Sequence, residues 1–263
     1  MGVSLHNFVT VQTTDIIRAD PTPLAKAFWG RYFERSVRSS FHHVMIDGEG
    51  GVAGWTPNAP RRMTEPLILF ATHHSWWDAA LSIVLSLRTL RLDAYGMMEH
   101  KQLQKYQFFR KIGMFSVVRE DPRSALRSIH HAADVLRGTG KSLWMFPQGE
   151  LIQQDVRPIS CDPGLGILTR LLGTAWLAPV AFRYEMVREQ RPDVFIRIGA
   201  PQRVVWSADM RIENVMREAQ DRLTALADGV RADAMAHNTA PYRTLYTGAR
   251  SMEKLFDTIT GKS

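Results

Sequence analysis

The stretch PLILFATHHSWWD, at residues 66–78, constrains this chain more than any other part of the sequence. It begins with a proline, and residues 67–71 then form a short apolar run of the kind that builds a strand buried on both faces. Two histidines, a serine and an aspartate follow, and residues 79–87 are an apolar stretch of good helix formers. The pattern predicts a strand, a turn and a helix, with imidazole and carboxylate groups at the turn, where open α/β sheets place ligands.

The spacing of these polar side chains allows two geometries. His74 and Asp78 are four residues apart and would share a helix face, whereas His73 meets Asp78 only if the histidine lies on the turn before the helix. A carboxylate bonded to one ring nitrogen fixes the tautomer of a histidine and leaves the other nitrogen free to take a proton from a hydroxyl. The alternative interpretation is a helix cap, because Ser75 with Asp78 three residues later resembles a capping box.

Segments typical of strands and of helices alternate along the rest of the chain. This alternation predicts an α/β fold with a mostly parallel sheet flanked by helices. Glycines predict a loop over residues 48–54, and residues 58–63 are expected to form a turn before the first strand. The predicted strands lie at 93–98, 114–118, 141–146 and 195–200, and the predicted helices at 101–111, 124–137 and 208–235.

Residues 23–41 predict a basic amphipathic helix. It either packs across the core with a solvated basic face or lies on a membrane, with aromatic side chains among the headgroups and arginines on anionic lipid. We expect this helical segment over residues 1–40 and the main domain over residues 41–263. The apolar side chains at spacings of three and four are Leu24, Phe28, Trp29, Tyr32, Phe33 and Val37.

The composition restricts the class of protein only loosely. A net charge of +7 and a pI near 9.8 suit nucleic acid, anionic lipid or phosphorylated small molecules as partners. The basic residues are spread along the chain without a nucleic-acid-binding fingerprint, so we expect no nucleic acid partner. The single cysteine, Cys161, excludes an internal disulfide and fits a reducing compartment. With no secretory signal and no apolar run of spanning length, the expected place is cytoplasmic, peripheral on the inner membrane face.

Three further motifs follow the histidine turn in a fixed order. Gly113 to Arg119 ends a predicted strand with a cation, residues 146–149 read Phe-Pro-Gln-Gly at the end of the next strand, and Pro179 lies in a later apolar run. Each motif alone is weak. Together, after T-H-x-S-x-x-D, they resemble the four sequence blocks of the glycerol-phosphate and lysophospholipid acyltransferase superfamily, of the 1-acylglycerol-3-phosphate acyltransferase type, over about residues 65–200.

The resemblance implies a mechanism of direct acyl transfer. His73 is the first residue of the family's H-x4-D pattern, so it would act as general base on an acceptor hydroxyl while Asp78 holds the ring. The acyl donor would be acyl-CoA or an acyl-carrier protein, with no other cofactor and no metal, and the acceptor a lipid-like alcohol. The matched substrate-binding positions are Ser75, Gly113, Arg119, Phe146, Pro147, Gln148, Gly149 and Pro179.

The third block departs from the family's usual F-P-E-G-T-R-S. Gln148 replaces the glutamate, Leu151 stands at the arginine position, and Glu150 adds a carboxylate. A carboxylate beside a phosphate is unfavourable by on the order of a few kcal/mol at an intermediate dielectric. The acceptor is then a non-phosphate one, such as a glycolipid or a glycosylated pigment, unless Arg157, six residues past Leu151, restores the lost cation.

Two other classes of protein compete with this interpretation. Three His-His pairs, the first of them His42-His43, suggest a metal hydrolase, although metal sites more often use a spacing such as H-x3-H. A basic, catalytically inactive homologue that docks on membranes is the second. The aromatic side chains Trp76, Trp77, Phe108 and Phe109 are either core residues or the wall of a groove for the acyl chain.

Overall fold

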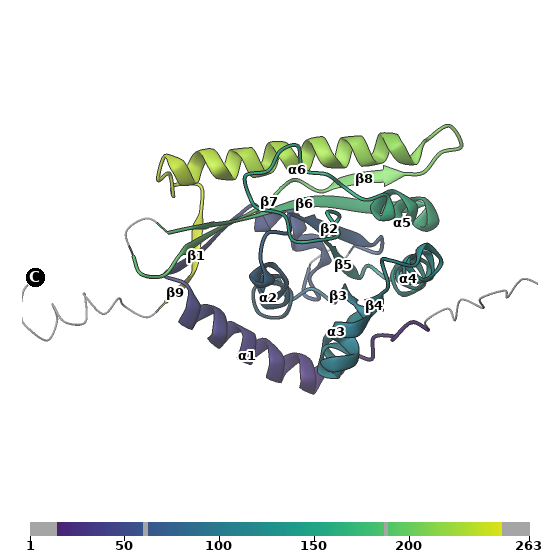
Figure 1. The fold of residues 1–263 in the computed structure, drawn as a ribbon, viewed down its shortest axis with the longest axis horizontal. Helices are drawn as coiled ribbons and strands as arrows, with labels where there is room; N and C mark the ends of the chain where they lie inside the picture. The colour runs from purple at the N-terminus through teal and green to yellow at the C-terminus, as the bar shows by residue number, and fades with distance from the viewer. Residues whose placement is uncertain (1–14, 60–62, 187–188, 249–263) are drawn as a thin grey trace, which may run out of the picture.

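The computed structural model describes residues 15–59, 63–186 and 189–248 (Figure 1). Its centre is a nine-stranded mixed sheet in the order β4-β3-β5-β2-β6-β7-β1-β9, with β8 paired to β6. The strands are β1 (His43–Asp47), β2 (Leu67–Ala71), β3 (Ala94–Glu99), β4 (Met114–Val117), β5 (Ser142–Met145), β6 (Thr174–Glu185), β7 (Asp193–Ile198), β8 (Gln202–Val205) and β9 (Arg243–Thr247).

The run from β4 through β6 is parallel throughout, and β1 pairs parallel with β7. Antiparallel pairs join β6 to β7 and to β8, and β1 to β9. Every residue of β2 and of β5 is buried, as in strands covered on both faces. The predicted fold class, a mostly parallel sheet flanked by helices, is therefore confirmed.

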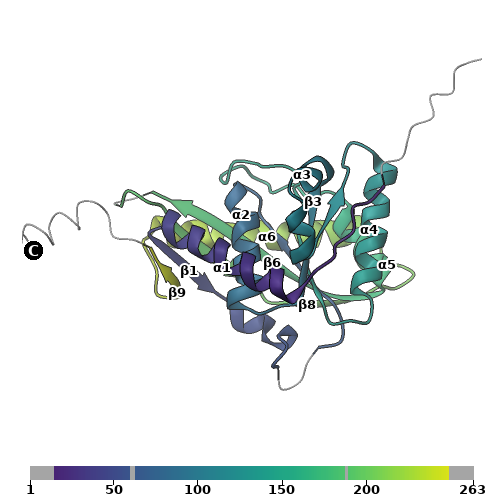
Figure 2. The same ribbon diagram turned by 90° about the horizontal axis from the view of Figure 1, so that it is seen from below.

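Two layers of helices cover the sheet (Figures 1 and 2). Alternate residues of β2 belong to two hydrophobic cores, because successive side chains of a strand point to opposite faces. The first core packs under α1 and α2, and the second under α4, α5 and α6. The helices are α1 (Pro23–Ser40), α2 (Trp76–Val84), α3 (His100–Lys105), α4 (Pro122–Leu136), α5 (Gly164–Leu172) and α6 (Ile212–Met235).

Helix α1 confirms the predicted N-terminal helix and has one buried side and one exposed side. The Thr22 hydroxyl caps its first turn by accepting a hydrogen bond from the Ala25 N–H. Phe33 and Val37 are buried in the first core, so the helix packs on the sheet. The other side of α1 leaves a stripe of large apolar side chains in solvent, made of Leu24, Phe28 and Tyr32. Within the described ranges no helix has both the length and the apolar character needed to span a bilayer.

Several elements differ from the sequence-based expectation. The predicted helix 101–111 is broken at Tyr106, where α3 ends and a 3-10 helix, Gln107–Ile112, begins. The loop predicted over 48–54 is a 3-10 helix, Glu49–Trp55, and the turn predicted over 58–63 falls partly outside the described residues. Helix α2 starts earlier than predicted and runs into a π-helical turn, Leu85–Thr89.

Candidate active site

The turn between β2 and α2 carries the predicted histidine and aspartate. Ser75 caps α2, its hydroxyl accepting from the Trp77 N–H at 3.2 Å. Asp78 Oδ2 accepts the backbone N–H groups of His74 at 2.6 Å and of Ser75 at 2.8 Å, which completes a capping box. The same oxygen lies 3.2 Å from His73 Nδ1. The carboxylate of Asp78 therefore caps α2 and also contacts the imidazole of His73, so the two interpretations of the sequence do not exclude each other.

Asp78 has no exposed surface, so each of its oxygens needs a polar partner. The second oxygen, Oδ1, accepts the phenolic O–H of Tyr184 at 2.5 Å. Burial, together with the charge of Asp78, raises the pKa of Tyr184 well above its usual range, which keeps the phenol protonated as a donor. Tyr184 is a residue that the sequence analysis missed, because 106 positions separate it from Asp78 and no motif links the two.

The two histidines of the turn have different environments. His73 stacks on Phe146 with ring centroids 4.3 Å apart, and about a fifth of its side chain is exposed. His74 turns its Nδ1 to the Ile152 carbonyl at 2.8 Å. Burial lowers the pKa of His74, so its ring is a neutral donor to that carbonyl. Of the two geometries that the spacing allowed, the structure thus pairs the imidazole of His73, not that of His74, with Asp78.

Two cavities meet at His73. The larger, of about 720 Å³, lies under the ends of β4 and β5, and charged side chains line it together with apolar ones from α4 and α5. The smaller, of about 330 Å³, lies between α1, α2 and the sheet and has mostly apolar walls. Both cavities include His73, Met97, Glu99, Phe146 and Leu151 in their linings. Trp76 and Phe109, left open between core and groove by the sequence, line the smaller cavity.

Gly113 and Arg119, the two predicted site residues around β4, have different roles. Gly113 has φ +109°, and a Cβ there would lie 2.7 Å from the Ala94 carbonyl oxygen, so this glycine is needed for the turn into β4. It is not among the residues that line either cavity. Arg119 follows β4, is exposed, and lines the larger cavity, where it is the single cation among the described lining residues.

The third block packs directly against the histidine. Gln148 is 7% exposed, and its side-chain Oε1 accepts the His73 N–H at 2.7 Å. An amide oxygen meets this need as well as a carboxylate does, so the exchange of Glu for Gln leaves the hydrogen bond possible. Gly149 has φ +73°, and a Cβ there would lie 2.5 Å from Asp162 Oδ2 and 3.0 Å from Arg119 Nη1. Gly149 therefore allows a carboxylate and a guanidinium to approach the same turn.

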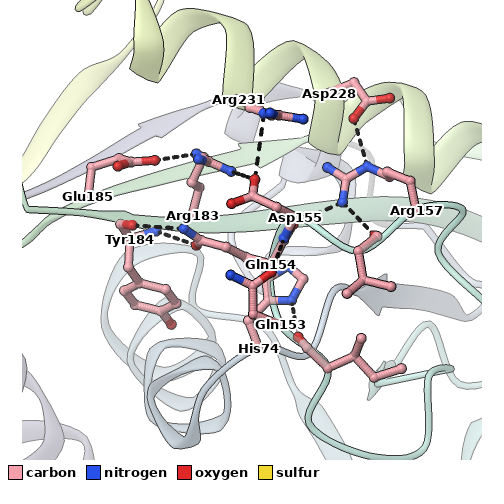
Figure 3. A network of polar contacts seen from close by, with 12 residues as sticks. His74, Gln153, Gln154, Asp155, Arg157, Arg183, Tyr184, Glu185, Asp228 and Arg231 are labelled. Carbon is pink, nitrogen blue, oxygen red and sulfur yellow. Dashed lines mark hydrogen bonds and ion pairs between the residues drawn. The ribbon is translucent and has the colours of Figure 1, made fainter.

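The loop after the third block is fastened by polar contacts (Figure 3). The Ile152 N–H donates to the His73 carbonyl at 2.9 Å, and Gln154 bonds the backbone of Tyr184. Asp155 pairs with Arg183 on β6 and with Arg231 on α6. These contacts connect the loop to the turn between β2 and α2 at one end and to the second helix layer at the other.

Arg157 does not occupy the position that the sequence analysis gave it. Its guanidinium pairs with Asp228 of α6 at 2.7 Å and also donates to the carbonyls of Gln154 and Val156 (Figure 3). It is absent from the linings of both cavities at His73, so its place does not support the role of a replacement cation. Pro179 is likewise outside these linings, buried in β6 beside Phe70 of β2.

Comparisons with known proteins agree with the arrangement of these blocks. A model of the acyltransferase family matches residues 56–183. A 1-acyl-sn-glycerol-3-phosphate acyltransferase of Streptococcus pneumoniae is 26% identical over 130 residues, which are 48% of this chain and 47% of that protein. The chain therefore spans about half the length of the curated relative it matches. The crystal structure of the 1-acyl-sn-glycerophosphate (LPA) acyltransferase PlsC from Thermotoga maritima superposes with a TM-score of 0.54 at 14% identity, over 80% of this chain and 79% of that one, and shows the shared fold.

Proposed function

Through residues 56–183 this chain belongs to the 1-acylglycerol-3-phosphate acyltransferase-like superfamily, and on that premise we propose that it transfers an acyl group from a thioester to the hydroxyl of a lipid acceptor. One observation carries the proposal. The imidazole of His73, oriented by the buried Asp78, stands where two largely apolar cavities meet, and the larger of them also has charged side chains in its lining. A base in that place has an acyl chain on one side and an acceptor on the other.

The proposed reaction is a single displacement. With Nδ1–H donated to Asp78, His73 presents Nε2 as a base and takes the proton of the acceptor hydroxyl. The acceptor oxygen attacks the thioester carbonyl, the carbon–sulfur bond breaks, and the imidazolium returns the proton to the departing thiolate. Asp78 stabilises the imidazolium between these steps. Acyl-CoA or acyl-carrier protein serves as co-substrate, and no acyl-enzyme forms.

Tyr184 is the positioning residue of this pair. Asp78 Oδ1 accepts the hydrogen bond of the Tyr184 phenol, whereas Oδ2 is shared among His73 Nδ1 and two backbone donors. The phenol fixes the rotation of the carboxylate, and the carboxylate fixes the ring. Phe41, at the end of α1, stacks on Tyr184 with centroids 5.8 Å apart and closes the outer side of the phenol.

The two cavities suit the two substrates. We place the acyl chain in the smaller one, whose walls include Phe33, Trp76, Ile83, Phe109 and Trp144. We place the acceptor in the larger one, beside Arg119. The amide oxygen of Gln148 and the backbone turn at Gly149 support the loop after β5, which in the family contains the third sequence block.

A non-phosphate acceptor is the second candidate, and the charges of the larger cavity favour it. Glu99, Glu150 and Asp162 line this cavity with Arg119, so carboxylates outnumber cations among the described lining residues. A phosphate dianion would meet more repulsion than attraction there. Hydroxyl groups of a glycolipid or a glycosylated pigment would instead donate hydrogen bonds to the carboxylates.

We also propose that the chain works at the cytoplasmic face of a membrane. The exposed stripe of Leu24, Phe28 and Tyr32 supports this, with basic residues such as Arg31 and Arg35 on the same exposed helix. The chain should pellet with anionic liposomes at low salt and release at high salt. Phe28→Ser should weaken the pelleting, and equal pelleting by this variant and the parent would remove α1 as the docking surface.

The test of the activity is thiol release from acyl-CoA and from acyl-carrier protein with a panel of acceptors. The panel contains glycerol 3-phosphate, lysophosphatidate and glycolipids. His73→Ala removes the base, and His130→Ala, an exposed histidine on α4, is the matched control. Release that depends on an acceptor, persists in the control and disappears in His73→Ala would support the transferase and identify its acceptor class. Release that is unchanged in His73→Ala would reduce the pair to a helix cap.

A further inference from the structure

A second group of histidines lies outside the catalytic turn, at the junction between α1 and the sheet. His42 lies two residues after the end of α1, His43 opens β1, and Asp193 opens the neighbouring parallel strand β7. The two imidazole rings lie 3.8 Å apart between centroids. None of these residues lines either cavity at His73, so the cluster would not touch the substrates of the acyl transfer proposed above.

Both imidazoles turn Nδ1 toward a single oxygen. Asp193 Oδ1 lies 3.0 Å from His42 Nδ1 and 3.4 Å from His43 Nδ1, and it also accepts the His43 backbone N–H at 3.0 Å. A carboxylate oxygen offers about two lone-pair sites, so three nitrogens converge where about two are accommodated as donors. The convergence has a simpler explanation if the ring nitrogens act as ligands with their lone pairs, not as donors.

The separations fit a small divalent ion. One ligand atom from each of the three residues lies within 4.8 Å of the others. Tetrahedral zinc, with bonds of about 2.0–2.1 Å, keeps its ligand atoms about 3.3 Å apart. The two ring-to-carboxylate distances, 3.0 and 3.4 Å, bracket that value. These two separations are thus of the size expected for ligand atoms that share one zinc ion.

A second carboxylate lies on the other side of the His42 ring. Its other ring nitrogen, Nε2, lies 3.9 Å from Glu189 Oε1. At this distance there is no direct hydrogen bond, but the carboxylate adds negative charge beside the ring, which favours a bound cation. All of these side chains are partly exposed, which leaves room for water as a further ligand.

We propose that His42, His43 and Asp193 form a binding site for one divalent ion of the zinc class. Two imidazoles and one carboxylate suit zinc better than magnesium or calcium, which prefer sites made of oxygen alone. The ion would clip the end of α1 to the first residues of β1 and β7. Phe41, the residue between α1 and the cluster, packs on Trp77 and Tyr184, so the clip would also hold the aromatic cover of the Asp78 network.

The test is titration of the full chain with zinc chloride by calorimetry, after removal of any affinity tag and of bound metal. We expect one saturable site and a rise of roughly 5 °C in the unfolding temperature at 100 times the Kd. Magnesium at the same concentration should leave the unfolding temperature unchanged. Neither readout requires an acyl donor or an acceptor, so failure here is separate from failure of the proposed activity.

The variants distinguish this site from other histidines. In His42→Asn/His43→Asn the amides remain able to donate to Asp193 but bind zinc poorly, so the fold should persist while the zinc site is lost. Asp193→Asn should weaken binding at least tenfold, and His130→Asn, an exposed histidine, should bind as the parent does. The proposal is overturned if the parent shows no saturable binding, or if the double variant, folded by circular dichroism, binds zinc as tightly as the parent.

Discussion

The two cavities beside His73 are made from different parts of the fold. Regular elements make the smaller one, through Phe33 of α1, Trp76 and Ala79 of α2, Gly96 of β3 and Trp144 of β5. The larger one owes its charged side chains mainly to segments that follow strands, namely Arg119 after β4 and Glu150 and Asp162 after β5. The apolar wall is thus tied to core packing, whereas the charged wall is set by loops.

This difference fits the place where the chain departs from the usual F-P-E-G-T-R-S pattern of the acyltransferase family. A substitution in a cavity wall that is part of the core disturbs the core packing. Loops tolerate substitutions as long as their backbone contacts persist. The loop after β5 keeps its contact with the turn through Gln148 and Ile152, even though its charges have changed. We therefore expect acceptor choice to respond to single substitutions in the loops, and donor chain length to respond to substitutions in the regular elements.

The largest expected effect is on His73, which lines both cavities, and on its partner Asp78. Asp78→Asn should lower kcat roughly 10³-fold for every donor and acceptor, because the amide cannot hold the imidazole in the correct tautomer. It should also lower the unfolding temperature, since Asp78 caps α2. His73→Gln should lose activity with little change in unfolding temperature. Equal loss of stability in both variants would mean that the pair serves the cap alone.

The proposed site of the acyl chain, the smaller cavity, can be tested by filling it with a larger side chain. Ala79→Phe places a ring in the smaller cavity, so kcat/KM with long-chain donors should fall roughly 30-fold while short-chain donors keep most of their rate. Leu126→Phe, in the wall of the larger cavity, is the matched control and should leave chain-length preference unchanged. A uniform loss across all chain lengths in Ala79→Phe would place the acyl chain elsewhere.

Tyr184→Phe tests the positioning role of the phenol. Loss of its hydrogen bond leaves Asp78 Oδ1 without its donor, so kcat should fall about tenfold with KM nearly unchanged, and stability should fall by about 1–2 kcal/mol. A kinetic titration separates the two roles, because freeing the carboxylate should also shift the acidic limb of the kcat profile. A variant that loses stability with an unaltered kcat would leave Tyr184 a purely structural residue.

The proposed binding of the acceptor in the larger cavity can be tested with two variants that change its charge in opposite directions. Glu150→Gln should improve kcat/KM for a phosphate acceptor about fivefold and Arg119→Gln should worsen it by a similar factor, because each changes one charge in a partly exposed site. A sugar-like acceptor should respond weakly to Arg119→Gln. If neither variant changes the ranking of acceptors, the larger cavity does not hold the acceptor.

The smallest effect concerns the other histidine of the turn. Burial lowers the pKa of His74 in the folded chain, so the unfolded state binds the proton more readily. The stability that His74 contributes is therefore present above its unfolded pKa of about 6.5 and is lost as pH falls below it toward the folded value. Urea midpoints between pH 7.5 and 5.5 should fall less steeply in His74→Asn, which keeps a donor for the Ile152 carbonyl. An identical slope would show that other groups cause the acid sensitivity.

The sequence located what is local and missed what the fold brings together. His73, Asp78 and the turn at Gly149 are recognisable because their partners lie within a few residues or in a fixed block. Tyr184 and Phe33 reach the site only through the register of β6 and the packing of α1, which no short pattern encodes. Arg157 illustrates the same limit, since its partner Asp228 lies 71 positions away.

The missed elements have physical reasons of their own. β6 contains Pro179, which lacks an N–H and argues against a central strand, yet its carbonyl still accepts the Gly199 N–H at 2.8 Å. α5 contains glycines that weaken a helical pattern. Gly166 is needed there because a Cβ would lie 2.8 Å from the Ile212 side chain of α6. In both cases a tertiary contact overrides the local preference of the residue.

The hydrogen bond from the His73 amide to Gln148 makes that amide a built-in probe. The amide proton of His73 exchanges with deuterated solvent only when its hydrogen bond to the Gln148 side chain is broken. The exchange rate therefore measures how often the loop after β5 separates from His73. A substrate that seats against this loop would slow the exchange at this one proton. The candidate acceptors can therefore be ranked by isotope labelling, before any turnover is detected.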